Sequence, residues 1–69
     1  MYNLEERIEM VSEGLLTVRE AEDFSGLRKS KLYDLMQSGE LPYAKCGGAR
    51  RIPRRALQEY MAKNLVVRG

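Results

Sequence analysis

The sequence predicts a mostly α-helical domain with a small β-hairpin and an extra helix at its N-terminal end. Apolar residues recur with helical spacing in four segments, each bounded by capping residues, proline or glycine. One glycine pair, Gly47-Gly48, separates two short runs that read as strands. With 69 residues, of which 43% are hydrophobic, the chain can fill one core but not two.

The segment 15–39 carries the clearest helix signals. Thr17 and Glu20 have the spacing of a capping box, which starts a helix at Val18. Gly26 then falls where a short helix ends, because glycine adopts the left-handed conformation at little cost. A second helix over residues 28–38 is expected to bury a one-sided stripe: Leu32, Leu35 and Met36. Helix, glycine turn and helix make the outline of a helix-turn-helix, whose second helix can enter a DNA major groove.

The inward face of the first helix is irregular. Helical spacing alone puts four residues on one side: Val18, Ala21, Glu22 and Ser25. A buried, unpaired glutamate is costly. We therefore expect this helix to turn so that Phe24 joins Val18 and Ala21 in the core, with Glu22 beside Lys29 or at an edge.

The outward face of the second helix is polar. It carries Ser30, Asp34 and Gln37, flanked by Lys31 and Tyr33, with Arg28 and Lys29 at the start. Most such faces are only solvated; the alternative is that Lys29, Lys31 and Tyr33 touch phosphates or base edges. Asp34 would be repelled by a duplex, so we expect it to pair with Lys31 rather than to accept from a cytosine.

A β-hairpin is predicted from Tyr43 to Ile52. A three-residue loop puts Ala44, Cys46 and Ile52 on one face; a two-residue loop is also possible. Lys45 faces Arg51 in the first register and Arg50 in the second, and like charges opposite each other are destabilising. Such a hairpin suits a place beside phosphates. Cys46 is expected to be a small apolar residue of the hairpin.

The extra helix is expected from Tyr2 to Glu13, capped by Asn3 with Glu6 and ended by Gly14. Its apolar stripe is narrow and consists of Leu4, Ile8 and Val11. This helix is expected to pack within the chain, to self-associate or to fray.

The last helix is expected to begin with Pro53 at its first position. Its buried stripe is predicted to be Ala56, Leu57, Tyr60, Met61 and Leu65. Arg54 and Arg55 gain nothing from the helix dipole at this end, which suggests an anion nearby.

Charge is distributed unevenly, although the net charge is only +2. Four glutamates stand against one arginine in residues 1–14, whereas eight lysines and arginines stand against two acidic residues in 28–55. The basic middle of the chain predicts a polyanion as partner.

Composition excludes several classes of protein. One cysteine and no histidine leave no disulfide framework and no credible zinc site. No leader and no membrane-spanning run is visible, so a cytoplasmic protein without membrane association is expected. So small a core, without histidine or a phosphate-binding loop, predicts no enzyme, no cofactor, no metal and no small-molecule substrate.

Several short motifs, in order, resemble the excisionase/AlpA-type DNA-binding family, a small relative of the MerR-type winged helix-turn-helix. They are Leu15-Leu16-Thr17-Val18, Glu20-Ala21, Gly26-Leu27, Ser30, Leu32-Tyr33, Gly39-Glu40-Leu41-Pro42 and Arg51-Ile52-Pro53-Arg54 with Ala56-Leu57. The resemblance covers residues 15–63 and implies an excision directionality factor or a small transcriptional regulator. Arg28 replaces the family's usual serine or threonine cap, and Glu22, Ser25 and Asp34 also depart from its pattern.

The resemblance implies that the second helix, 28–38, sits in the major groove and that the hairpin wing, 43–52, reaches the backbone or minor groove. The expected DNA-binding residues are Arg28, Lys29, Ser30, Lys31, Tyr33, Lys45, Arg50, Arg51 and Arg54.

The expected organisation is an acidic helix at 1–14, a winged helix-turn-helix DNA-binding domain at 15–65 and a tail at 66–69. The predicted function is sequence-specific binding of double-stranded DNA. An alternative is an adaptor that docks a recombinase or polymerase subunit through the N-terminal helix, and self-association remains open.

Overall fold

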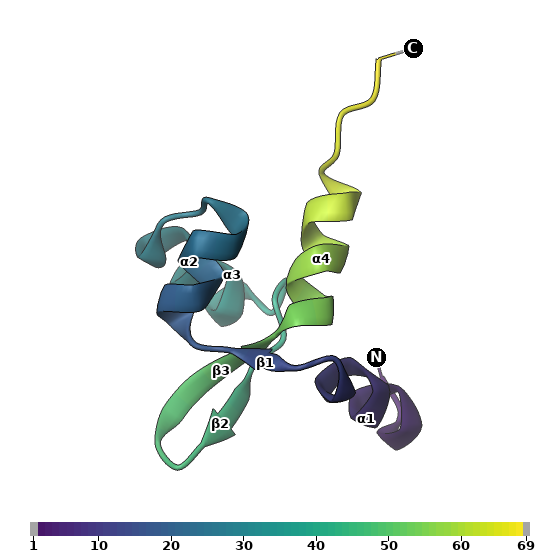
Figure 1. Cartoon of the computed structure of the whole chain (residues 1–69), viewed down its shortest axis with the longest axis vertical. Coiled ribbons are helices and arrows are strands. Elements are labelled where there is room, and N and C mark those ends of the chain that lie inside the picture. Colours follow the sequence, from purple (N-terminus) through teal and green to yellow (C-terminus); the bar gives the residue numbers. More distant parts are fainter. Residues whose placement is uncertain (1, 69) are drawn as a thin grey trace.

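The computed structural model describes residues 2–68. In chain order they form α1 (Leu4–Ser12), β1 (Leu15–Leu16), α2 (Val18–Ser25), α3 (Lys29–Ser38), β2 (Ala44–Cys46), β3 (Ala49–Pro53) and α4 (Arg54–Lys63), as Figure 1 shows. The predicted class, mostly helical with a hairpin and an added N-terminal helix, is confirmed. The two-residue strand β1 was not predicted.

Both predicted capping boxes form. The Glu6 amide donates to Asn3 Oδ1 at 2.8 Å, and the Asn3 amide donates to Glu6 Oε1 at 2.9 Å. In the same way the Glu20 amide donates to Thr17 Oγ1 at 3.0 Å, and the Thr17 amide donates to Glu20 Oε1 at 2.8 Å. Arg28 caps α3 without a side-chain hydrogen bond, as the missing serine or threonine predicted. These local signals therefore fix where the helices begin.

The core lies between α2, α3, α4 and the sheet. Its fully buried large side chains are Leu32, Leu41, Ile52 and Leu57. The predicted stripe of α3 is confirmed, since Leu35 and Met36 are buried beside Leu32. Because these three apolar side chains pack one face of α3 against the core, the opposite face of the helix is exposed to solvent.

The predicted rotation of α2 is wrong. Ala21 is fully buried and Val18 packs against the core, but Phe24 is 39% exposed. Ser25 takes the inner position, where its hydroxyl donates to the Ala21 carbonyl at 2.7 Å and accepts from the Leu27 amide at 3.1 Å. A half-buried hydroxyl with both bonds made costs little, so the smaller residue can face inward.

Glu22 is half-buried on the same side of α2. Among residues 2–68 it forms no ion pair with Lys29, and its partial exposure agrees with the other expected place, an edge of the core.

The sheet is antiparallel with strand order β1-β3-β2. Cys46 pairs with Ala49, and Lys45 pairs with Arg50, so the loop has two residues and the three-residue alternative is wrong. Gly47 and Gly48 have φ of +58° and +85°, as a type I′ hairpin turn requires. Cys46 is exposed on the hairpin.

The helix α4 begins at Arg54, one residue later than predicted, and Pro53 is its N-cap. Ala56 and Leu57 are buried, and Tyr60 and Met61 are partly buried. Leu65 lies beyond the helix and is 70% exposed, so its predicted burial is wrong. Residues 66–68 of the expected tail extend away from the domain in Figure 1, and residue 69 lies outside the described residues.

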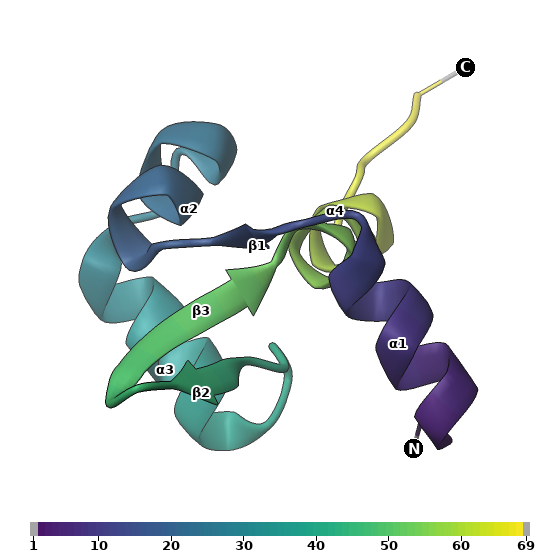
Figure 2. The ribbon, with the colours of Figure 1, turned by 60° about the horizontal axis from the view of Figure 1, so that its bottom comes forward.

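The helix α1 packs within the chain, against α4, but not through its predicted stripe (Figure 2). Met10 is buried, whereas Leu4, Ile8 and Val11 are 70%, 56% and 41% exposed. The Gly14 carbonyl accepts from the Arg54 amide at 2.9 Å, which ties the end of α1 to the start of α4.

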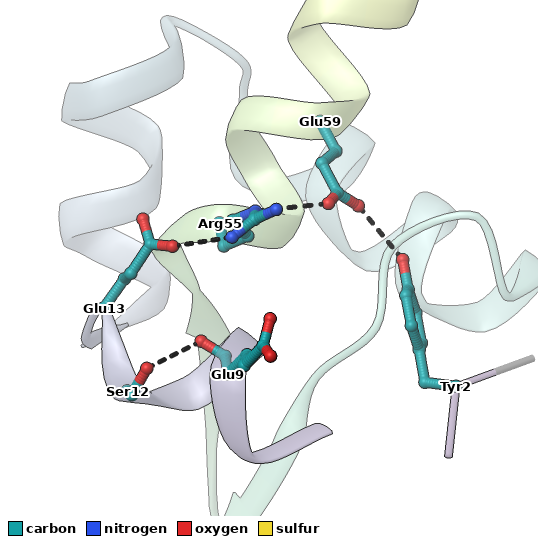
Figure 3. Close-up of polar contacts among 6 residues, drawn as sticks. All are labelled: Tyr2, Glu9, Ser12, Glu13, Arg55 and Glu59. Atoms are coloured by element: carbon teal, nitrogen blue, oxygen red, sulfur yellow. Dashed lines mark hydrogen bonds and ion pairs between the residues drawn. The ribbon is translucent and has the colours of Figure 1, made fainter. Parts of the chain in front are cut away.

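Polar contacts also hold α1 (Figure 3). Arg55 forms ion pairs with Glu13 at 2.8 Å and with Glu59 at 3.4 Å, and the Tyr2 hydroxyl donates to Glu59 at 3.0 Å. That bond raises the pKa of Tyr2, and the bond to Glu13 raises the pKa of Arg55. The anion expected near the start of α4 is thus partly supplied by the protein itself. In the described part of the chain, no helix has the length and apolar character to cross a membrane.

Candidate nucleic-acid interface

The helix α3 presents a polar face to solvent. Ser30, Asp34 and Gln37 are exposed opposite the buried stripe. Helical geometry puts Lys29 and Tyr33 on one flank of this face and Lys31 on the other. The first flank is the one that meets the hairpin.

Arg50, on β3, lies over two aromatic rings. Its Cζ is 5.0 Å from the centroid of the Tyr33 ring and 4.7 Å from that of Tyr43. Lys29 Nζ is 5.9 Å from the Tyr33 centroid. We call these four residues, Lys29, Tyr33, Tyr43 and Arg50, the wing cluster. Each contact is a cation–π interaction, which favours a fixed position of the cation.

The wing cluster joins α3 to the hairpin. Three of its members were predicted site residues, and the sequence analysis missed Tyr43. A signal was present in the two-residue register. There Tyr43 stands two positions before Lys45, on the face that Lys45 and Arg50 share. The alternation of side chains therefore places a tyrosine next to an arginine.

The cations of this face have no carboxylate partner within residues 2–68. The ion pairs found there both belong to Arg55. Arg50 is half-buried as a residue, its guanidinium donates no hydrogen bond to the described residues, and Lys45 is its partner across the ladder. Like charges opposite each other are unfavourable unless an anion lies nearby.

Arg51 and Arg54 turn to another part of the molecule. Alternation along β3 puts Arg51 on the opposite face from Arg50, and Arg54 Cζ lies 5.3 Å from the centroid of Phe24 on α2. Both arginines help to lower the pKa of Glu20, after the larger effect of the hydrogen bond from the Thr17 amide. Arg51 also donates to the Arg50 carbonyl at 3.3 Å, but neither arginine lies over the tyrosine rings of the wing cluster. The predicted site residues thus fall into two groups.

The remaining predicted site residues lie on α3 and at its start. Arg28, Ser30 and Lys31 are exposed. The expected pair between Lys31 and Asp34 is absent among residues 2–68, since both ion pairs found there involve Arg55. Both side chains are left to solvent, so Lys31 is available to an external anion.

No cluster of histidine, cysteine and carboxylate side chains that could hold a metal ion occurs within residues 2–68. The wing cluster itself offers cations, which bind phosphate, and aromatic rings, which hold the cations; neither is a usual metal ligand.

Comparison with known proteins supplies a second kind of information. A family described as "Helix-turn-helix domain" matches residues 15–65. A protein of Saccharopolyspora erythraea named "Probable excisionase" is 47% identical over 49 residues, which cover 71% of this chain and 50% of that protein. The chain therefore spans about half the length of this relative. No solved structure matched significantly.

Proposed function

The chain belongs to the family of helix-turn-helix domains, and from that premise we propose that it binds double-stranded DNA in a sequence-specific manner. In this proposal α3 lies in the major groove, and the hairpin wing, residues 43–52, lies along the backbone or minor groove. The support comes from the open polar face of α3 and from the cations of the hairpin beside it.

One observation carries the proposal: Lys45 and Arg50 face each other across the ladder, with no carboxylate partner among the described residues. Their mutual repulsion is relieved when both face phosphates, because each then gains an opposite charge. A hairpin that served only to complete the fold would gain stability from an opposite charge at one of these positions.

The residues divide by role. We assign Lys29, Ser30 and Lys31, with Arg28 at the entrance, to the groove and its nearest phosphates. Lys45 and Arg50 are assigned to the backbone beside the groove. Arg51 and Arg54 are expected to contribute less, because Glu20 and Phe24 already engage them.

The relative's name suggests the biological role. We propose an excisionase-like role in DNA recombination, in which the protein binds beside a recombinase, with control of transcription as the other role open to such a domain. An excision factor should bend its site, and a regulator should occupy a promoter. Circular permutation of a bound DNA fragment measures the bend. The relationship to MerR-type proteins stays a prediction.

The experiment begins with selection of bound fragments from the source genome, followed by fluorescence anisotropy against salt. If about five phosphates are neutralised, log K should fall with log[salt] at a slope of about −4.5. The double variant Lys45→Ala, Arg50→Ala should weaken binding to all sequences and reduce the slope by about 2. Lys63→Ala, an exposed lysine at the far end of α4, is the control.

The substitutions Lys29→Ala and Lys31→Ala should, in addition, change which sequence is preferred. An affinity that does not respond to salt would contradict the proposal. A wing variant that binds as tightly as the unmodified protein would contradict the role of the hairpin alone.

A second candidate function concerns α1. Its exposed stripe, Leu4, Ile8 and Val11, is not used by the fold, although Met10, Glu13 and Tyr2 fix the helix to α4. Through Val11 the stripe continues into an open groove of about 310 Å³ between α1 and the base of the hairpin. We propose that a recombinase or polymerase subunit docks here, which makes the protein an adaptor.

The adaptor function is tested with Leu4→Ser, Ile8→Ser and the purified recombinase encoded beside the target site. The double variant should no longer bind the recombinase, and its affinity for DNA should be unchanged. Leu65→Ser, which changes an equally exposed leucine beyond α4, is the control. Unchanged binding of the recombinase would discard the adaptor function.

A further inference from the structure

We propose that Tyr43 is a positioning residue, which together with Tyr33 holds the Arg50 guanidinium ready for a DNA phosphate. This inference rests on the proposed DNA binding and adds to it a residue for which sequence reasoning gave no role. It also links the hairpin to α3, because the two rings belong to different parts of the chain.

The geometry of the wing cluster supports a positioning role. Tyr43 precedes β2, Arg50 lies on β3 and Tyr33 lies on α3, so one guanidinium bridges three segments. An arginine side chain loses much conformational freedom when it is fixed in a complex. If two aromatic rings already fix the arginine side chain in the free protein, less conformational entropy is lost when DNA binds.

The chemistry of arginine allows this double use. Its guanidinium is planar, stacks on aromatic faces and keeps its N–H donors at the edge of the plane. No such donor of Arg50 is used within residues 2–68. The side chain is thus held through its faces and free at its edge.

The surroundings favour a phosphate over a base edge. Lys45 faces Arg50 across the ladder, and Lys29 Nζ lies 5.9 Å from the centroid of the Tyr33 ring that Arg50 also contacts. Three cations from separate segments, with no ion pair to a carboxylate of the described residues, match the repeated charge of a nucleic-acid backbone. Phosphate contacts of Lys45 and Arg50 carry no sequence information, whereas Lys29 also reaches the groove.

The role of Tyr43 is not that of a core residue. It is 37% exposed and is not one of the buried residues of the core. Its ring contacts Arg50 on one side and lines the open groove beside α1. An effect of Tyr43 on DNA affinity would therefore not come from a disrupted core, and substitutions of Tyr43 in the presence and absence of Arg50 test whether it acts through Arg50.

The first test needs no DNA. In the free protein, the NMR signal of the Arg50 side-chain Nε–H should be shifted by the ring currents of the two tyrosines. Tyr43→Phe should keep this shift, because the aromatic face remains, and Tyr43→Leu should lose part of it. An Arg50 signal at its ordinary position in the unmodified protein would overturn the proposal.

The second test is DNA affinity, measured with the selected duplex and with an unrelated one. Tyr43→Leu should weaken binding to both by about two- to fivefold, the range of a solvent-exposed cation–π contact. Tyr43→Phe should restore most of this loss. In the Arg50→Ala background, Tyr43→Leu should have almost no further effect, because the side chain that it positions is gone.

The outcomes separate the two proposals. If the unmodified protein binds no duplex, both fail, whatever the NMR signal. If it binds and Tyr43→Leu lowers the ring-current shift without changing affinity, the positioning role alone fails. Thermal denaturation of each variant shows whether a loss of DNA affinity comes from unfolding. If Tyr43→Leu unfolds the protein, Arg50→Lys provides a second test. This variant keeps the charge but cannot stack as a plane, so it should also lose affinity.

Discussion

The hairpin turn offers the sharpest test of the fold. Gly47 has φ of +58°, and a Cβ added there would meet no atom within 4 Å. A substitution at this position therefore changes the backbone energy without creating a clash. We compare Gly47→Val with Gly47→Asn, because asparagine tolerates the left-handed region and valine does not.

The magnitude follows from the backbone. An L-residue in the left-handed region costs about 1–2 kcal/mol. For 69 residues the entropy of unfolding is about 145 cal/mol/K, so this cost lowers Tm by roughly 7–14 °C if the hairpin unfolds with the rest. Gly47→Asn should lower Tm by no more than about 3 °C.

Thermal denaturation followed by circular dichroism measures both variants, and DNA affinity is measured beside it. Gly47→Val should also weaken DNA binding, because the turn sets the positions of Lys45 and Arg50. Equal Tm values together with equal DNA affinities for the valine and asparagine variants would refute the two-residue turn. Equal Tm values with a loss of DNA affinity in the valine variant would mean that the hairpin opens independently of the core.

Three further predictions concern the rest of the fold. Leu57→Ala should destabilise the protein by about 2–5 kcal/mol in urea denaturation, since Leu57 is fully buried. The hydrogen bond from the Thr17 amide is the main cause of the lowered pKa of Glu20. The ionised carboxylate therefore stabilises the folded protein above about pH 4.5, and this stabilisation is lost as the pH falls through the lowered pKa. Glu20→Gln should flatten that part of the pH dependence; an unchanged curve would contradict it. Arg55→Met should change stability by less than about 1 kcal/mol, because the ion pairs are nearly half exposed, but should speed amide exchange in α1.

Features with local causes could be predicted from the sequence. Asn3 with Glu6 and Thr17 with Glu20 each need only residues three positions apart, and both capping boxes form. The apolar stripe of α3 was equally legible, because Leu32, Leu35 and Met36 fit one face. Helix starts and the buried side of a regular helix are decided within a few residues.

Features that depend on distant partners could not be predicted. The strand β1 exists only because Leu15 and Leu16 pair with Pro53 and Ile52, far along the chain. Helical spacing found an apolar stripe on α1, but the position of α4 decides that Met10 is buried instead. In both cases the sequence shows which residues could pack or pair, but not the distant segment against which they do so.

The candidate site was predicted in part. The basic residues of α3 and the hairpin were identified as one set, but the structure divides that set into two groups. Alternation along β3 sends Arg50 to the wing cluster and Arg51 toward α2. The register of the hairpin decides which of the two arginines joins the wing cluster and which lies near α2, and the sequence left two registers open.

The central claim is that α3 and the hairpin wing together form the surface that meets DNA. Backbone-amide NMR during titration with the selected duplex tests it most directly. We predict that the largest shifts fall in residues 28–37 and 43–51 and that α1 and the end of α4 change little. Shifts concentrated on α1, or no shifts at duplex concentrations near that of the protein, would contradict the account.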